Sequence, residues 1–186
     1  MTSKIIKANQ NGKIFLDLVK PIFDSYFCSD YNLVDIGAGN GCCGLFWPNF
    51  VYFVDRRKPN TFDDILQVNP KTNFKYCETD FVDFDTRSVE GKTSFVGIHT
   101  CRNLADLIID RAISERTPLA IIPCCHPSLN EYIHDDSVQN LFSGNCAVYI
   151  DRIRQKKLLE NNFEVYYRII ESINPPKNRI IIGLPK

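Results

Sequence analysis

Apolar and polar residues alternate along the chain in two patterns, one typical of buried strands and the other typical of amphipathic helices. Short apolar runs predict strands at 31–37, 49–55, 72–80, 93–101 and 118–126. Apolar residues at helical spacing predict helices at 11–27, 61–68, 103–114 and 148–162. Pro21 interrupts the first helical pattern, so we expect a kink or a break there. Two further strands are predicted at 163–173 and 178–185.

The order of these elements predicts the fold. Strands that alternate with helices form mainly parallel sheets covered on both faces. The last two strands are separated only by the turn-forming residues NPPK, too few for a crossover helix, so they should pair antiparallel. We therefore predict an α/β fold: a Rossmann-like, doubly wound, mainly parallel seven-stranded sheet with a C-terminal antiparallel hairpin. Dinucleotide-dependent dehydrogenases differ, because their sixth strand stays parallel.

Length and charge narrow the functions that are compatible with the chain. Its 186 residues suffice for one domain with a sizeable core, so we predict a single domain over 1–186, with an N-terminal helical segment at 1–30. Lys and Arg together number 22, as do Asp and Glu, so there is no overall basic field to attract nucleic acid. Local basic clusters at 55–59 and 151–157 would contact phosphates if RNA binds, although the second is typical of a solvated helix face.

No apolar run approaches the ~20 residues that a membrane-spanning helix requires, and the first residues lack the apolar core of a signal peptide. These features predict a cytoplasmic protein with no membrane partner. The eight cysteines are then expected to be reduced thiols. They include no CxxC pair, which argues against a structural zinc site.

A glycine-rich stretch, DIGAGNGCC, follows the first of these strands. Gly37, Gly39 and Gly41 permit a tight turn and let a ligand lie against bare backbone. Cys42 occupies the third glycine position of the dehydrogenase fingerprint, and the lysine of a P-loop is missing. Asp35 precedes the turn, where its carboxylate can meet a cationic ligand group or orient the loop amides. Beside a pyrophosphate such a charge would be unfavourable.

Acidic residues also end the next two predicted strands. Asp55 is well placed to accept hydrogen bonds from both hydroxyls of a ribose, which suits NAD and S-adenosylmethionine (SAM) equally. Asp80 is followed by Phe81, and an acid next to an aromatic residue suits the amino group and the ring face of adenine. Together with the glycine-rich stretch, these residues therefore predict a site for an adenine nucleoside.

Together these motifs resemble those of class I SAM-dependent methyltransferases. DIGAGNG resembles their first motif, VYFVD the strand that ends in a ribose-binding acid, and ETDF the adenine contact. The resemblance implies SAM as the cofactor, bound by Asp35, Gly37, Gly39, Gly41, Asp55, Asp80 and Phe81. The alternative is a Rossmann-like domain that binds a different nucleotide.

Later blocks are similar to those of a narrower group of small methyltransferases with HxCG, PCCH and TPKNR blocks, a group similar to the tRNA 2′-O-methyltransferases that act on the acceptor stem. The similarity covers most of the chain from about Asn32 onward. Arg102 stands where that pattern has Gly, and Pro175 where it has Thr. The resemblance implies RNA, either tRNA or rRNA, as the acceptor, contacted by Arg102, Asn178 and Arg179. Arg179 could instead pair with an acid inside the fold.

Histidines and cysteines gather at the ends of the fourth and fifth predicted strands, where doubly wound sheets bind ligands. The candidate catalytic residues are His99, Cys101, Cys124 and His126. Either histidine could act as a general base towards the methyl acceptor. A cysteine could act as a nucleophile, as in RNA cytosine-C5 methyltransferases, although the TC and PC motifs have the inverse order here. The ligand types also suit zinc, but their spacing supports it poorly, so we predict no metal. Simple packing explains at least two of the four without any function.

The sequence thus predicts a SAM-dependent methyltransferase that acts on RNA, with a partner protein or a second copy of the chain to recognise a large RNA. The alternatives are a methyltransferase for small molecules or proteins, and a catalytically inactive SAM-binding subunit for assembly or partner recognition. Arg102 favours the inactive subunit, because its side chain would block the acceptor pocket.

Overall fold

A computed structural model describes residues 3–28, 30–125, 146–174 and 177–186. Within them, the helices are α1 (Ser3–Phe27), α2 (Thr61–Val68), α3 (Asn103–Glu115) and α5 (Cys146–Glu160), with short 3-10 helices η1 (Gly44–Phe46) and η2 (Thr86–Ser88). The strands are β1 (Asn32–Ile36), β2 (Val51–Asp55), β3 (Phe74–Glu78), β4 (Thr93–Cys101), β5 (Leu119–Cys125), β6 (Phe163–Ile169) and β7 (Arg179–Pro185).

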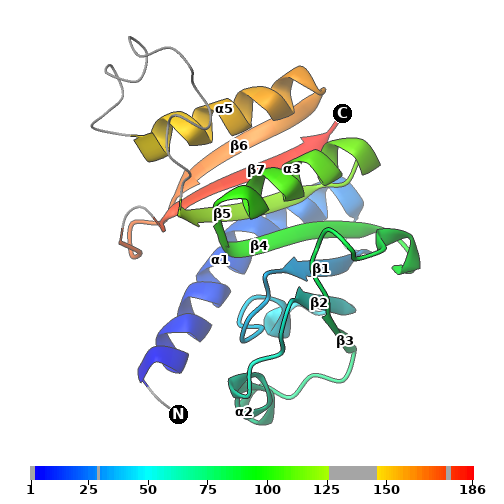
Figure 1. The fold of residues 1–186 in the computed structure, drawn as a ribbon, viewed down its shortest axis with the longest axis vertical. Helices are drawn as coiled ribbons and strands as arrows, with labels where there is room; N and C mark the ends of the chain where they lie inside the picture. The colour runs from blue at the N-terminus through cyan, green and yellow to red at the C-terminus, as the bar shows by residue number, and fades with distance from the viewer. Residues whose placement is uncertain (1–2, 29, 126–145, 175–176) are drawn as a thin grey trace. The chain divides into compact units, whose positions relative to one another are not determined.

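The seven strands have the order β3-β2-β1-β4-β5-β7-β6 in the sheet (Figure 1). β1 pairs in parallel with β2 and β4, and β2 pairs in parallel with β3. β7 runs antiparallel to both β5 and β6. This arrangement confirms the predicted α/β fold with a mainly parallel seven-stranded sheet and a C-terminal antiparallel hairpin.

Two compact units make up the chain, Met1–Ile98 and His99–Lys186, and β4 passes from the first into the second. The single domain that the length predicts stays a prediction. Among the described residues, no helix combines the length and the apolar composition needed to span a membrane.

Helix α1 differs from its prediction in two ways. It begins at Ser3 rather than at residue 11, and it continues through Pro21. Proline removes one backbone hydrogen bond from a helix. However, Phe15 and Phe23 lie on either side of Pro21 and are fully buried, so packing of the same apolar stripe holds both halves of the helix. The expected break therefore does not occur.

Aromatic side chains pack α2 against the strands of the first unit. Phe62 of α2 packs edge-on against Phe53 of β2 and against Tyr76 of β3, with ring centroids 5.1 and 4.8 Å apart. These contacts fix α2 beside the ends of two parallel strands, where the acidic residues lie.

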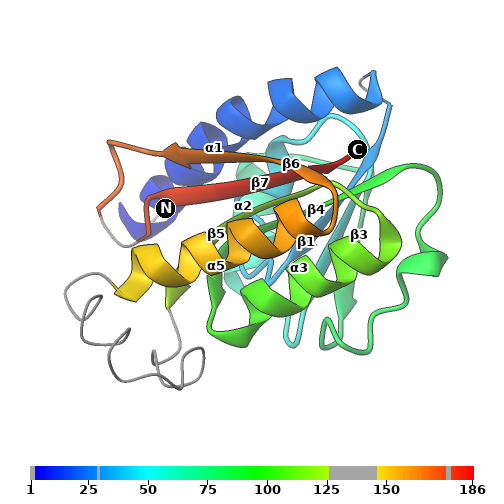
Figure 2. The same ribbon diagram turned by 90° about the horizontal axis from the view of Figure 1, so that it is seen from above.

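In the second unit, α3 and α5 lie side by side on one face of β5, β7 and β6 (Figure 2). Apolar residues of both helices, such as Ile108 and Leu158, are fully buried. β7 lies between β5 and β6 and is buried along its whole length. Because β7 opens with Arg179, a charged side chain is carried into this core, and its pairing is described below.

Candidate functional site

The glycine loop, residues 37–43, connects β1 to η1. Gly37, Gly39 and Gly41 have φ angles of 66°, 50° and 70°, a region in which an L side chain is strained. A Cβ at Gly41 would in addition lie 2.6 Å from the ring of Phe62. The turn therefore favours glycine at all three positions that the sequence singled out, and the space around it requires glycine at Gly41.

Neighbouring elements hold the glycine loop in place. The Gly39 N–H donates a hydrogen bond to Oδ2 of Asp55 (2.8 Å), and the Tyr76 hydroxyl donates to the Gly39 carbonyl (3.1 Å). The hydroxyl of Thr61, the first residue of α2, donates to the Asn40 side chain. Tyr76 was not predicted as a site residue, because in the sequence it is only one aromatic residue of an alternating strand.

Asp35 lies beneath the loop and is only 2% exposed. Its Oδ2 accepts a hydrogen bond from the N–H of Gly44 (3.0 Å), the first residue of η1, directly after the loop. The two roles predicted for Asp35, orienting the loop amides and meeting a cationic ligand group, stay predictions. Burial raises the pKa of this carboxyl to about 7; the Gly44 hydrogen bond opposes the shift, and the charge of Asp55 adds to it. Burial likewise raises the pKa of the Cys42 thiol, to about 11, so that this thiol is neutral.

Asp80 and Phe81 follow β3. The Val82 N–H (3.2 Å) and the Arg56 guanidinium (2.7 Å) donate hydrogen bonds to Asp80, and both contacts lower the pKa of its carboxyl. Phe81 is 4% exposed and packs edge-on against Phe95. The aromatic face that the sequence suggested for adenine thus lies in the core of the unit.

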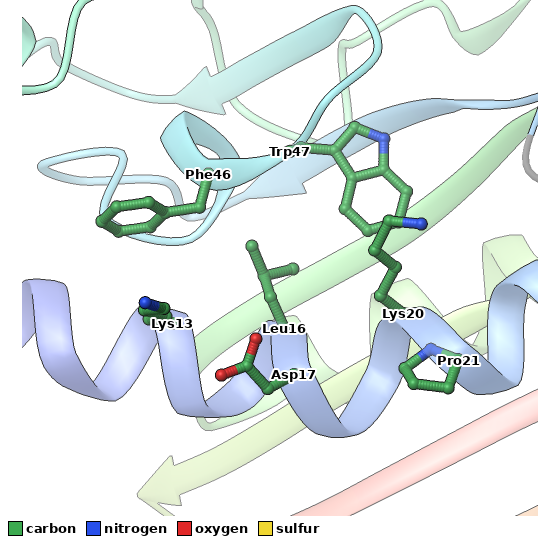
Figure 3. A pocket seen from close by; sticks show the side chains of 7 residues that line it. All are labelled: Lys13, Leu16, Asp17, Lys20, Pro21, Phe46 and Trp47. Atoms are coloured by element: carbon green, nitrogen blue, oxygen red, sulfur yellow. The ribbon is translucent and has the colours of Figure 1, made fainter.

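Helix α1 contacts the glycine loop directly. Gly12 makes this possible, because a Cβ there would lie 2.2 Å from the Cys42 carbonyl oxygen. Beside the contact, a pocket of about 310 Å³ separates α1 from η1, with the aromatic residues on the η1 side and Leu16 between the lysines of α1 (Figure 3). It is lined by Lys13, Leu16, Asp17, Lys20, Pro21, Phe46 and Trp47. None of these is a residue predicted to bind the cofactor.

The basic cluster at 55–59 is largely neutralised by acids. Arg56 pairs with Asp80, and the Lys58 ammonium lies 2.6 Å from a carboxylate oxygen of Asp63. Arg57 is exposed. As a surface for RNA phosphates, this cluster is therefore weaker than its sequence indicates.

In the second unit, two predicted catalytic cysteines meet. The sulfur atoms of Cys101 and Cys124 are 2.9 Å apart, and Cys101 Sγ donates to the His99 carbonyl (3.4 Å). Partial burial, followed by the charge of Lys177, lowers the pKa of His99, so that its imidazole is mainly neutral at neutral pH.

His126, the fourth candidate, lies outside the described residues. In the part of the chain that is described, no group of three or more His, Cys, Asp or Glu side chains could hold a metal ion. The general-base hypothesis and the prediction that no metal is bound both concern His126, and both stay predictions.

Arg102 is exposed at the end of β4 and precedes α3. Its φ of 49° and ψ of −124° belong to a region in which glycine is favoured. The backbone thus keeps the conformation expected from the Gly of the resembled group, although the residue is Arg. Its carbonyl accepts a hydrogen bond from Arg154 (3.3 Å), which holds this turn in place.

Replacing Arg102 by Gly should stabilise the protein by about 1 kcal/mol. The release of backbone strain, worth about 1–3 kcal/mol, exceeds the added entropy of the unfolded chain, about 0.5–1 kcal/mol. Urea denaturation measures the difference. Arg102→Ala is the control, because alanine retains the Cβ and hence the strain. Equal stabilities of the two variants would contradict strain at this position.

Arg179, a predicted substrate-binding residue, has a different role. Its Nε donates to Oδ2 of Asp151 (2.6 Å), and both side chains are buried. The alternative that Arg179 pairs with an acid inside the fold is therefore confirmed, and a contact of Arg179 with substrate stays a prediction. Asn178 is also buried, and its carbonyl accepts the Ile170 N–H (2.8 Å) across the hairpin.

The basic stretch 151–157 is in part the solvated helix face that its composition predicts, because Arg152, Lys156 and Lys157 are exposed, but Arg154 is an exception. Arg154 is 1% exposed, and its Nε and Nη2 donate to the two carboxylate oxygens of Asp106 (2.9 and 2.8 Å). Its Nη1 lies 3.6 Å from Asp151. The four side chains Asp106, Arg154, Asp151 and Arg179, here called the buried ion network, join α3, α5 and β7.

Comparison with known proteins shows which folds the chain resembles. No protein-family model and no curated protein matches the sequence. Solved structures do match. The methyltransferase domain of bacterial CtHen1-CN aligns over 95% of this chain and 99% of that one, with a TM-score of 0.59 and 13% identity. Magnesium protoporphyrin IX methyltransferase (ChlM) from Synechocystis PCC 6803, with bound SAH, aligns over 100% and 89%, with a TM-score of 0.56 and 16% identity.

An rRNA methylase from Streptococcus thermophilus aligns over 85% of this chain and 87% of that one, with a TM-score of 0.51 and 14% identity. The fold is that of SAM-dependent methyltransferases. At these identities the methyltransferase similarity is one of fold. The resemblance drawn from the sequence is confirmed at this level, and the narrower acceptor-stem tRNA group stays a prediction.

Proposed function

We propose that the protein is a SAM-dependent methyltransferase that binds SAM at the glycine loop of its first unit. The observation that carries the proposal is the hydrogen bond from the Gly39 N–H to Asp55, which fixes a loop of positive-φ glycines against the acid that ends β2. In a methyltransferase fold, this is where the nucleoside of the cofactor is expected.

The residues at the loop fit such a ligand. The Gly39 N–H donates to only one carboxylate oxygen of Asp55, Oδ2. Within the described residues no hydrogen bond involves the other oxygen, Oδ1 of Asp55, which can accept from a ribose hydroxyl. Asp80, held ionised by Val82 and Arg56, adds an acceptor that suits an amino group. Asp35 adds a carboxyl beneath the loop, and a cationic ligand would favour its charged form.

When bound, SAM would supply a methyl group on a positively charged sulfur, already activated for transfer to a nucleophile. The protein's share is then to position the acceptor and to receive its proton. His99 is the candidate proton acceptor in the second unit, because its lowered pKa keeps the imidazole neutral at neutral pH. His126 remains a candidate from the sequence.

The acceptor that we propose is RNA. The similarity to an rRNA methylase supports it. With Arg154 and Arg179 buried, the exposed and unneutralised cations of the two basic clusters and of the turn after β4 include Arg57, Arg102 and Arg152. Lys156 and Lys157 are exposed as well, but they pair with Glu160 and Asp110. So few cations bind RNA weakly. A partner protein or a second copy of the chain would therefore supply the remaining contacts to a large RNA.

A catalytically inactive SAM-binding subunit is the second candidate, and Arg102 favours it. The side chain is exposed next to Cys101, where it would obstruct an acceptor. If it does, Arg102→Gly should raise methyl transfer above the wild-type rate. If the protein is inactive for another reason, the variant should bind SAM but transfer nothing.

Calorimetric titration tests the cofactor. The wild-type protein should bind SAM and SAH but not NAD. Asp55→Asn keeps an acceptor for the Gly39 N–H but loses the charge that ribose hydroxyls contact. It should weaken SAM binding by about 1–3 kcal/mol, or about 5- to 150-fold. Asp63→Asn, an exposed acid of α2, is the matched control and should bind as the wild type does.

An unchanged SAM affinity in Asp55→Asn would remove Asp55 from the site. Binding of NAD without binding of SAM would overturn the proposed cofactor. Transfer of tritium from labelled SAM into separated RNA, protein and metabolite pools then identifies the acceptor. Label in protein or metabolites but not in RNA would replace the RNA proposal.

A further inference from the structure

A pair of thiols lies where β4 and β5 end. Cys101 is exposed, whereas Cys124, on the neighbouring strand, is 7% exposed. Their sulfur atoms are 2.9 Å apart, close enough for one thiol to donate a hydrogen bond to the other. A disulfide bond is about 2.05 Å long, so an approach of about 0.9 Å would convert this contact into a bond.

The backbone around the pair suits such a bond. Adjacent strands are about 4.8 Å apart, within the range of Cα separations that a disulfide bridges, about 4.4–6.8 Å. The two strands are also joined near the cysteines, where the Thr100 hydroxyl donates to the Ile122 carbonyl (3.4 Å). The strand spacing and the sulfur contact therefore favour a bond formed by rotation of the two side chains.

We propose that Cys101 and Cys124 form a site of reversible oxidation, at which a peroxide converts the two thiols into one disulfide bond. This inference concerns the second unit and does not depend on the proposed methyltransferase activity. Exposure decides the order of events: a small peroxide reaches Cys101 first, and Cys124 then reacts with the oxidised sulfur beside it.

The chemistry balances as follows. The thiolate of Cys101 attacks one oxygen of hydrogen peroxide, the O–O bond breaks, and a sulfenic acid and hydroxide result. The sulfur of Cys124 then attacks the sulfenic sulfur, the S–S bond forms, and the sulfenic oxygen leaves as water with the proton of the Cys124 thiol. In sum, two thiols are oxidised and one peroxide is reduced to two molecules of water. A dithiol reductant restores the thiols.

The disulfide would engage two of the four candidate catalytic residues, Cys101 and Cys124, at once. It would also join β4 covalently to β5 one residue before Arg102, whose carbonyl is bound by the buried Arg154. All residues proposed to bind SAM belong to the first unit. Oxidation should therefore leave SAM affinity unchanged while it alters whatever takes place at the thiols.

Peptide mapping of the full chain after treatment with hydrogen peroxide tests the proposal. The wild type should yield a Cys101–Cys124 cross-linked peptide, lighter by two hydrogen atoms than its separate parts, and dithiothreitol should restore both thiols. Cys28→Ser is the matched control, since it removes another exposed thiol but leaves the pair intact, and it should give the same cross-link.

Two variants test the order of the steps. In Cys124→Ser, Cys101 should stop at the sulfenic acid, which dimedone captures. In Cys101→Ser, Cys124 should be oxidised at least tenfold more slowly, because it is shielded from solvent. Disulfides between other cysteines, or wild-type oxidation of Cys101 beyond the sulfenic acid without a cross-link, would overturn the proposal. So would stoichiometric zinc in untagged protein whose thiols react only after chelation.

Discussion

Asp151→Asn should lower the free energy of unfolding by about 3–5 kcal/mol, the cost of leaving a buried charge without its partner. Asp151 is fully buried, accepts a hydrogen bond from Arg179 at 2.6 Å and lies 3.6 Å from Arg154. Asparagine has the same shape but no charge, so two guanidinium groups lose the carboxylate that balances them. Urea denaturation at neutral pH measures the loss.

Asp110→Asn is the matched control. Asp110 also joins α3 to α5, through Lys157, but both side chains of that pair are largely exposed, so the loss should stay below about 1 kcal/mol. A double-mutant cycle of Asp151→Asn with Arg179→Gln should give a coupling of about 2 kcal/mol. Similar losses in Asp151→Asn and Asp110→Asn would mean that the buried ion network adds nothing beyond a surface pair.

The second large effect is a dependence of stability on pH that arises from Asp35. Its folded-state pKa of about 7 lies above the ordinary value of 3.8, so the folded protein binds this proton more tightly than the unfolded chain does. The stabilisation that this bound proton contributes is therefore fully present below about pH 4 and declines as pH rises to about 7. Above that pH, the contribution of Asp35 to stability no longer changes. The decline should be about 4 kcal/mol.

Asp35→Asn isolates this contribution, because asparagine can still accept the Gly44 hydrogen bond without carrying a charge. We expect the variant to match the wild type within about 1 kcal/mol at pH 4 and to exceed it by about 2–4 kcal/mol at pH 8. Denaturation curves across this range measure the difference, and Asp17→Asn, an exposed acid, should follow the wild type. A difference between Asp35→Asn and wild type that does not grow with pH would show that folding does not raise the pKa of Asp35.

Local patterns predicted the fold and the glycine turn well, because their causes are local. The predicted strands follow from runs of apolar residues, and the hairpin follows from a connection too short for a helix. Gly37, Gly39 and Gly41 adopt positive φ because the turn after β1 requires it. Asp55 ends a strand next to β1, so parallel pairing alone brings it to the loop.

Partners that are far apart in the sequence could not be predicted in the same way. Arg154 reads as one of several basic residues, and nothing near it indicates that Asp106 will lie opposite. One signal was present: Ile150, Arg154 and Leu158 recur every four residues and share a helix face, which places the arginine on the buried side. At Pro21 a local signal was present but misleading. The proline predicted a kink or a break, but packing of the apolar residues around it outweighed this effect.

Trp47 gives the molecule a built-in optical probe. It is the one tryptophan in the sequence and directly follows η1, which continues from the glycine loop. Its indole N–H donates to the Tyr31 carbonyl (3.4 Å), and the Lys20 ammonium lies 5.6 Å from its ring centroid. All tryptophan emission therefore arises from the junction of α1 with the loop. A shift in its wavelength or lifetime would report rearrangement at that junction, with no label added.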